Sequence, residues 1–220
     1  MLTPAKKEFI EFMMSADVLR FGDFVTKSGR NTPYFVNTGN YRTGLQISRL
    51  GEFYADLVHE AVGGGFDAMF GPAYKGIPLV TTTAGALARA HGVDKPFFFN
   101  RKEAKDHGEG GNLVGYKPKD GDRVIIIEDV ITAGTAVREV MPILRACGDI
   151  RVTDMFISVN RCEFGQNPQK TAIMEMEEEF GIRVHAIVTV RDIEEYLRGR
   201  EDYAHLLPLM EDYMSKYCLF

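Results

Sequence analysis

Cysteine is scarce in this chain of 220 residues. Cys147, Cys162 and Cys218 are odd in number and widely spaced, so they predict neither a disulfide framework nor a zinc site. No apolar run is long enough to span a bilayer, and residues 1–20 lack the apolar core of a signal peptide. The formal net charge of −5 argues against a general nucleic-acid or membrane surface. We therefore expect a soluble, cytoplasmic protein with no nucleic-acid or membrane partner.

Two familiar phosphate-binding motifs are also absent. The sequence contains no Gly-x-x-x-x-Gly-Lys-Ser/Thr, and no Gly-x-Gly-x-x-Gly follows a predicted strand. A phosphate site in this chain must therefore be built in another way.

Residues 124–136 have the composition of such a site. Four aliphatic residues predict a strand buried on both faces, as in a parallel sheet. Glu128 and Asp129 follow at its end, and a run of small residues then leads into helical spacing. Backbone N–H groups at a helix N-terminus suit a phosphate, which Gly134 allows to come close. The acids would repel a phosphate and suit sugar hydroxyls or a divalent cation, so the stretch predicts a ribose phosphate site. The alternative is an ordinary turn with a solvated acid pair.

The rest of the chain predicts one α/β domain with parallel strands. We expect helices over residues 6–16, 47–62, 78–90, 171–180 and 193–197, and parallel strands over 66–70, 96–99, 152–159 and 184–190. Residues 19–37 predict a hairpin or a pair of edge strands separate from this sheet. Asp192 could cap the helix that follows it, and Pro142 predicts a kink in a helix that ends near Gly148.

Two polar segments lie beside predicted strand ends. Residues 71–78 hold two glycines and two prolines, which fix an irregular backbone and place Lys75 at the carboxyl edge of the sheet. Residues 100–114 form a long polar loop with three glycines, which indicates either a lid that carries positive charge or a mobile surface loop. His107 alone does not distinguish a lid from a surface loop.

The sequence pattern alone does not assign a function to three further polar side chains. Arg161 follows a predicted strand and could bind a carboxylate or carbonyl, or cap a helix. Lys27 lies beside a turn, where a lysine is usually a solvated surface group. His185 lies in a buried strand, and we expect it to be structural.

Residues 124–136 resemble the signature of the type I phosphoribosyltransferases, which bind phosphoribosyl diphosphate (PRPP). This signature is an apolar strand, two acids, two variable residues and Thr-x-Gly-Thr. Over nearly its full length, the sequence resembles the bacterial orotate phosphoribosyltransferases within that family. The segments that carry this resemblance are 24–30, 32–35, 71–78, 100–111 and 128–136. The loop 100–111 is the most specific of them.

The resemblance implies the type I phosphoribosyltransferase fold, an α/β fold with a central, mainly parallel sheet flanked by helices. It also implies a flexible catalytic loop and a small N-terminal hood, at about 1–40, on a PRPP-binding core at about 41–220, all in a single domain. The implied reaction transfers ribose 5-phosphate from PRPP to orotate, giving orotidine 5′-monophosphate and pyrophosphate in pyrimidine (UMP) biosynthesis. Mg²⁺ would arrive bound to PRPP, near Glu128 and Asp129, with no ligand supplied directly by the protein.

The resemblance also implies a role for each site residue. PRPP would be bound by Lys27, Tyr74, Lys75, Arg101, Lys102, Lys105, His107, Glu128, Asp129, Val130, Ile131, Thr132, Ala133, Gly134, Thr135 and Ala136. Orotate would be bound by Lys27, Phe35, Val36, Thr132 and Arg161, with main-chain contacts at Phe35 and Val36. The catalytic residues would be Lys102, Lys105, His107 and Asp129.

In this family the loop reaches across a two-fold axis, so the resemblance implies a homodimer in which Lys102, Lys105 and His107 act in trans. Two alternatives remain at this point. One is a regulatory protein that keeps the PRPP pocket as a sensor, which predicts an eroded loop and an added DNA-binding helix pair. The other is a related transferase for a purine base.

Overall fold

The computed structural model describes residues 2–25, 29–102, 112–131 and 134–220, with only the backbone of residues 135 and 136. Its helices are α1 (Pro4–Ser15), α2 (Gly44–Val62), α3 (Gly76–His91), α4 (Thr135–Arg145), α5 (Ala172–Phe180), α6 (Val190–Arg198) and α7 (Leu207–Tyr217), with 3-10 turns η1 (Thr38–Asn40) and η2 (Glu201–Leu206). Its strands are β1 (Leu19–Val25), β2 (Asn31–Val36), β3 (Ala68–Gly71), β4 (Phe97–Asn100), β5 (Leu113–Gly115), β6 (Arg123–Ile127), β7 (Arg151–Asn160) and β8 (Arg183–Thr189).

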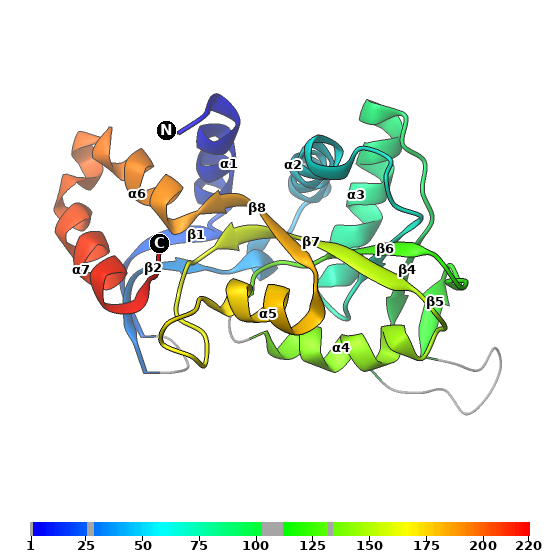
Figure 1. Cartoon of the computed structure of the whole chain (residues 1–220). Helices are drawn as coiled ribbons and strands as arrows, with labels where there is room; N and C mark the ends of the chain where they lie inside the picture. Colours follow the sequence, from blue (N-terminus) through cyan, green and yellow to red (C-terminus); the bar gives the residue numbers. More distant parts are fainter. Residues whose placement is uncertain (1, 26–28, 103–111, 132–133) are drawn as a thin grey trace.

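The central sheet has six strands in the order β5-β4-β3-β6-β7-β8. β3, β4, β6, β7 and β8 are parallel, whereas β5 at one edge runs antiparallel to β4. Helices α1, α2 and α3 cover one face of the sheet, and α4 and α5 cover the other (Figure 1). The mainly parallel sheet between two helical layers that the sequence predicts is confirmed.

β6 lies inside the sheet and is buried on both faces. Val124 and Ile126 belong to the core under α4 and α5, whereas Ile125 and Ile127 belong to the core under α1, α2 and α3. All four side chains are fully buried. A continuous aliphatic run suits this position because successive side chains of a strand point to opposite faces. The acid pair therefore begins where an entirely apolar strand ends.

The two ends of the chain meet beside the sheet. β1 and β2 form a separate antiparallel pair, as the sequence predicts. The C-terminal helices α6 and α7 lie beside this pair (Figure 1). Tyr34 of β2 and Tyr213 of α7 meet edge to face, with ring centroids 5.6 Å apart. The N-terminal hairpin and the C-terminal helix thus pack into one layer, while the boundary of the hood near residue 40 stays a prediction.

The start of α6 differs from the sequence-based expectation. The N-cap is Thr189, and Asp192 is the third residue of the first turn. Asp192 accepts from the Thr189 backbone N–H at 2.8 Å, and its own N–H donates to the Thr189 hydroxyl at 3.2 Å. Because of this reciprocal capping box, the helix begins at Val190, whereas a cap at Asp192 would place its start at Ile193. Asp192 also pairs with Lys6 of α1 at 2.9 Å.

β5 is an element that the sequence did not predict. It has three residues, and its pairing with β4 joins Asn100 to Leu113. Just beyond this pair, the Arg101 N–H donates to the Asn112 carbonyl at 2.6 Å. Three residues carry too little periodicity to indicate a strand, so long-range pairing decides the conformation. The polar loop therefore begins and ends on neighbouring strands.

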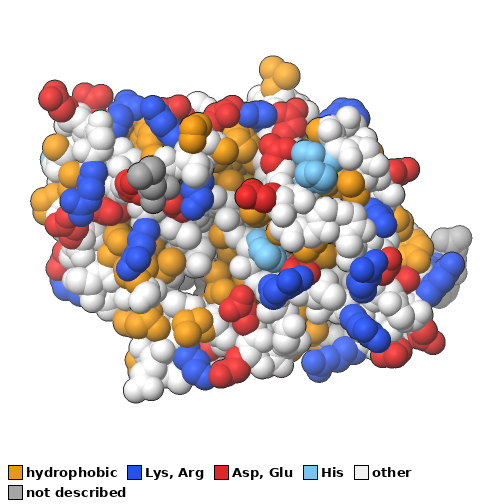
Figure 2. Space-filling view, turned by 45° about the horizontal axis from the view of Figure 1, so that its top comes forward, with side chains coloured by type: hydrophobic (Ala, Val, Ile, Leu, Met, Phe, Trp, Pro, Cys, Tyr) orange, Lys and Arg blue, Asp and Glu red, His pale blue; other side chains and the backbone are white. Residues whose placement is uncertain are grey.

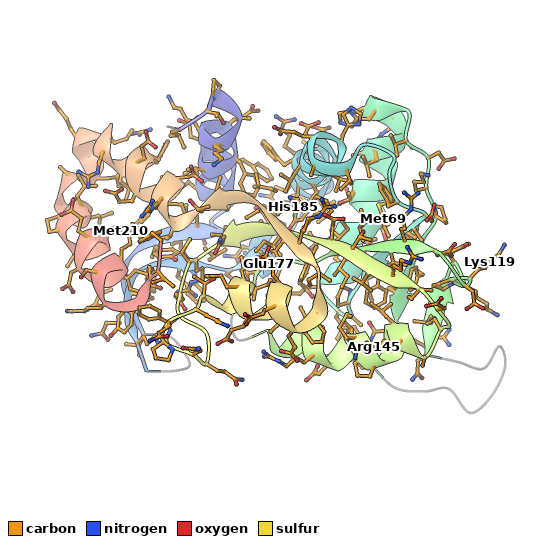
Figure 3. The ribbon with its side chains drawn as sticks, in the orientation of Figure 1. Met69, Lys119, Arg145, Glu177, His185 and Met210 are labelled. Carbon is orange, nitrogen blue, oxygen red and sulfur yellow. The ribbon has the colours of Figure 1, made fainter. Side chains whose placement is uncertain are left out.

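The core extends from the sheet to the last helix. Met69 on β3 and Met210 on α7, both labelled in Figure 3, are fully buried members of the same cluster. His185 on β8 is part of the sheet's packing: its ring stacks on Phe156 at 4.8 Å, and its Nε2 lies 2.8 Å from Asp154 Oδ1.

Charged side chains of both signs are interspersed over the face shown in Figure 2. Within the described parts of the chain, no helix combines the length and apolarity that crossing a bilayer requires.

Candidate functional site

The acid pair lies at the carboxyl edge of the sheet and is held there by its backbone. The Tyr54 hydroxyl donates to the Glu128 carbonyl at 2.7 Å. The Asp129 carbonyl accepts from both the N–H and the hydroxyl of Ser158, at 2.9 and 2.6 Å. These bonds fix the position from which both carboxyl groups project. The sequence predicts Tyr54 on the apolar face of α2, but this pattern does not indicate that its hydroxyl bonds the Glu128 carbonyl.

Among the described residues, three donors surround the carboxylate of Asp129. The Lys75 ammonium and the Thr38 hydroxyl both lie 2.8 Å from Oδ2, and the Val130 N–H donates to Oδ1 at 2.7 Å. Burial would raise the pKa of Asp129, but Lys75, followed by Thr38 and Val130, holds it below its ordinary value. Asp129 is therefore an anion in the ligand-free protein.

Glu128 has the opposite character. Its side chain is 6% exposed, and its Oε1 accepts from the Asp129 N–H at 2.9 Å. Burial, with a further contribution from the negative charge of Asp129, raises the pKa of Glu128 to about 8. The two neighbouring acids therefore carry different charges at neutral pH, a difference that the sequence alone does not indicate.

The turn after β3 brings Lys75 to this point. A Cβ at Gly71 would lie 2.2 Å from the Gly76 carbonyl oxygen, so the turn closes only with glycine there. The Asn100 side chain at the end of β4 accepts from the Ala73 N–H at 2.8 Å and fixes the turn from the other side. Sequence reasoning missed this role of Asn100, although its place at a strand end is a usable signal.

Cationic and aromatic side chains gather beside this turn. Tyr74 is 65% exposed, and the Lys102 ammonium lies 5.3 Å from the centre of its ring. Lys75 lines a cleft of about 420 Å³ together with Thr38, and its side chain is 59% exposed. Arg101 follows directly on β4. The structure thus brings Tyr74, Lys75 and Lys102 together, while Lys105 and His107 lie outside the described residues.

α4 begins within the run of small residues, where the sequence predicts a helix. Gly134 has φ +71°, and α4 begins at Thr135, so N–H groups of the first turn are free of helical partners. Val130 and Ile131 pack their side chains against the two cores, and the Val130 N–H is bonded to Asp129 Oδ1. Thr132 and Ala133 lie outside the described residues, as do the side chains of Thr135 and Ala136.

Arg161 projects from the end of β7 into a largely buried network. Its Nη2 lies 2.7 Å from Glu163 Oε1 and donates to the Tyr213 hydroxyl at 3.1 Å. Its guanidinium carbon lies 5.3 Å from the centre of the Tyr34 ring, and its buried Nε has no hydrogen-bond partner among the described residues. A guanidinium with an unpartnered buried donor suits an anionic ligand.

The other predicted orotate residues lie on β2. Phe35 is 37% exposed, next to the fully buried Tyr34 that contacts Arg161. Val36 is half-buried at the end of the strand. The structure therefore places Arg161 against the same strand as Phe35 and Val36, whereas Lys27 lies outside the described residues. Sequence reasoning missed Glu163 and Tyr213, because nothing in their local pattern links them to Arg161.

The site residues fit a divalent cation that is held mainly by a substrate. Among the described residues, no group of three His, Cys, Asp or Glu side chains is arranged to hold a metal. Mg²⁺ is usually bound through one or two carboxylates together with substrate phosphates, and Asp129 is an ionised carboxylate beside the cleft. Asp129 is thus a suitable neighbour for Mg²⁺ bound to a phosphorylated ligand, with the protonated Glu128 beside it.

The comparisons with known proteins agree with this geometry. Residues 37–153 match the family model of the phosphoribosyl transferase domain. The crystal structure of the Francisella tularensis orotate phosphoribosyltransferase has a TM-score of 0.85 and 35% identity, covering 96% of this chain and 100% of that one. The fold and the site thus define a phosphoribosyltransferase.

Curated relatives narrow this class. The orotate phosphoribosyltransferase of Clostridium beijerinckii is 55% identical over 196 residues, which are 89% of this chain and 87% of the relative. That of Cronobacter sakazakii is 49% identical over 216 residues, which are 98% of this chain and 99% of the relative. The chain belongs to the orotate phosphoribosyltransferase family.

Proposed function

We propose that this chain catalyses the orotate phosphoribosyltransferase reaction. It transfers ribose 5-phosphate from PRPP to a ring nitrogen of orotate, giving orotidine 5′-monophosphate and pyrophosphate in pyrimidine biosynthesis. The observation that carries the proposal is the convergence of three features at one sheet edge. These are the N-terminus of α4, the ionised Asp129 beside Lys75, and the buried Arg161. The identity to orotate phosphoribosyltransferases over nearly the whole chain supports it.

Each feature matches one part of the substrates. The backbone of residues 132–136 suits the 5-phosphate, because N–H groups at a helix N-terminus bind anions. Asp129, with Glu128 beside it, suits the ribose hydroxyls. Arg161, next to the strand that carries Phe35 and Val36, suits the orotate anion.

The remaining cations suit the pyrophosphate. Lys75 lines the cleft, Tyr74 precedes it, and Arg101 follows β4. Lys102, Lys105 and His107 would complete this set from the loop of the partner chain. Placed cations stabilise charge that develops on a leaving group, and they act most strongly where water is excluded.

The residues can support the displacement without a strong base. The bond from the anomeric carbon to pyrophosphate breaks, positive charge builds on the ribose, and the nitrogen of orotate forms the new bond. Asp129 is already ionised and lies where it can stabilise the ribose cation. The attacking ring nitrogen loses its proton as the new bond forms, and the departing pyrophosphate can accept that proton. His107 is therefore better suited to assist pyrophosphate than to act as the base.

Mg²⁺ fits this reaction as part of the PRPP complex. When bound to the oxygens of PRPP near Glu128 and Asp129, it would add positive charge at the departing pyrophosphate.

A spectrophotometric assay tests the proposed reaction. The protein is supplied with PRPP and Mg²⁺, and then with orotate, uracil or hypoxanthine in separate reactions. Consumption of orotate, with no change in the other two reactions, is the expected result. Consumption of hypoxanthine would indicate the purine transferase instead. Binding of PRPP without turnover of any base would indicate the sensor.

We also propose a homodimer in which Lys102, Lys105 and His107 act in the partner's site. Mixing a His107→Ala variant with an Asp129→Asn variant tests this arrangement. If the loop acts in trans, mixed dimers contain one site with both residues intact, and activity returns. If each chain uses its own loop, the mixture stays as inactive as its components.

A further inference from the structure

Thr38 contacts the acid pair from a distant part of the chain. Its hydroxyl donates to Asp129 Oδ2 at 2.8 Å, across 91 positions of sequence. Thr38 is the first residue of η1, two positions after β2 ends at Val36. The hydrogen bond therefore joins the end of the strand expected to bind orotate to the acid expected to bind PRPP.

The turn that carries Thr38 is held on both sides. The Asn37 N–H donates to the Val18 carbonyl at 2.8 Å, and the Asn40 side chain donates to the Asp17 carbonyl at 2.6 Å. Within the turn, the Asn37 side chain accepts from the Gly39 N–H at 3.2 Å. Thr38 has a short side chain on this fixed backbone, so its hydroxyl has little freedom to leave Asp129.

Lys75 contacts the same carboxylate oxygen, Asp129 Oδ2, but differs from Thr38 in the length and freedom of its side chain. Its side chain is long and 59% exposed, and under the proposed function its charge is needed by pyrophosphate. When Lys75 turns toward pyrophosphate, Thr38 remains as the side-chain donor on Oδ2. The Val130 N–H still holds Oδ1. Asp129 then keeps its orientation through two neutral donors.

A neutral donor is suited to this task. A hydroxyl orients a carboxylate by one hydrogen bond without cancelling its charge, whereas a second cation would compete with the positive charge of the ribose. A hydroxyl also has no net charge with which to draw pyrophosphate away from the cationic side chains.

We propose that Thr38 is a positioning residue that holds Asp129 in the orientation that PRPP requires. This inference rests on the proposed function for the identity of PRPP and for the role of Asp129. It assigns Thr38 no contact with either substrate.

The test is a double-mutant cycle on PRPP binding. Mg²⁺–PRPP affinity is measured by calorimetry for the wild type, Thr38→Val, Asp129→Asn and the double variant. Valine keeps the shape of threonine and removes the hydroxyl. A hydrogen bond to a charged group supports a loss of about 10- to 100-fold in affinity for Thr38→Val. In the Asp129→Asn background the same change should cost less than about 2-fold, because the charged partner is gone.

Two further variants separate positioning from a general structural effect. Thr38→Ser restores the hydroxyl and should stay within about 3-fold of the wild type. Thr81→Val removes a hydroxyl that bonds the Ile77 carbonyl on the exposed side of α3, and it should leave PRPP affinity unchanged. The KM for orotate should change less than the KM for PRPP in Thr38→Val.

The inference is overturned if Thr38→Val loses equal affinity in both backgrounds, if it binds PRPP like the wild type, or if Thr38→Ser fails to rescue it. Failure of the proposed function would look different. The wild type would then not turn over orotate, while the cycle would still report whether Thr38 acts through Asp129. A wild type that does not bind PRPP overturns both.

Discussion

Arg161 Nη2 lies 2.7 Å from Glu163 Oε1, and the two side chains are only 15% and 14% exposed. Arg30 reaches the other oxygen of Glu163 at 3.4 Å, and the Tyr213 hydroxyl donates to Oε1. Two guanidinium groups therefore contact one carboxylate, and the guanidinium of Arg161 lies beside the Tyr34 ring. Under the proposed function, this guanidinium is suited to an anionic base such as orotate.

We predict that Arg161→Met raises the KM for orotate at least 10-fold and lowers the free energy of unfolding by roughly 3 kcal/mol, because it leaves a buried carboxylate with a weaker partner. Urea unfolding and steady-state kinetics measure the two effects. Adding Glu163→Gln should recover part of the stability but not the KM. Recovery of both would show that Arg161 only compensates Glu163.

The raised pKa of Glu128 gives a stability prediction. The folded state holds a proton on Glu128 that the unfolded chain releases near its ordinary pKa of about 4.3. The stabilisation is therefore complete below that value, and it is lost as pH rises through the folded pKa of about 8. Between pH 5 and 8 the loss is at most about 1.4 kcal/mol per pH unit.

Glu128→Gln removes this titration and should flatten the dependence of unfolding free energy on pH over the same interval. Urea unfolding at pH 6 and pH 8 is the measurement. Asp129 acts in the opposite direction at lower pH, because its pKa is lowered and its stabilisation disappears as pH falls through it. Equal slopes for the wild type and Glu128→Gln would mean that Glu128 is already ionised in the folded protein.

Gly134 and Gly181 form a matched pair for the phosphate turn. Both have positive φ, +71° and +69°. A Cβ at Gly134 would lie 2.4 Å from the sulfur of the fully buried Met176, whereas a Cβ at Gly181 would have no atom within 4 Å. We predict that Gly181→Ala costs about 1 kcal/mol and leaves activity unchanged. Gly134→Ala should cost more and also raise the KM for PRPP. Equal effects on both properties would contradict a close-packed phosphate turn.

Pro142 lies inside α4 and is exposed to solvent. It has no N–H for the Arg138 carbonyl, so Pro142→Ala adds one helical hydrogen bond and relieves the contact of the ring with that carbonyl. Alanine also makes the unfolded chain more flexible, which offsets about 0.4–1 kcal/mol. We predict a net gain of about 1–2 kcal/mol in unfolding free energy with unchanged kinetics. Destabilisation would indicate that the greater flexibility of the unfolded chain outweighs the added hydrogen bond.

The sequence predicts best the helices and strands whose conformation depends on neighbouring residues in the chain. β6 was predictable because four aliphatic residues in a row suit a strand between two helical layers. Helix α5 was predictable from Thr171 at its start and Gly181 at its end, both of which act as caps. The start of α6 was placed wrongly because Thr189 and Asp192 cap it jointly.

The contacts that organise the site are long-range, and composition does not reveal them. Asp129 meets Lys75 and Thr38 across 54 and 91 positions, and the ring of Tyr34 meets Tyr213 of the last helix. Different partners give Glu128 and Asp129 different charges although the two residues are adjacent in sequence and equally buried. The resemblance to a family supplied the substrates, whereas only the fold supplies the partners of each side chain.

The central claim is that Asp129 and the turn before α4 bind the ribose phosphate of PRPP, with Lys75 released to pyrophosphate. A crystal structure of the protein with PRPP and Mg²⁺ tests it most directly. We predict that the 5-phosphate lies on the N–H groups of residues 132–136, that Asp129 accepts from the ribose hydroxyls, and that Lys75 contacts the pyrophosphate oxygens. A 5-phosphate bound away from this turn, with the ammonium of Lys75 still 2.8 Å from Asp129 and away from pyrophosphate, would contradict the account.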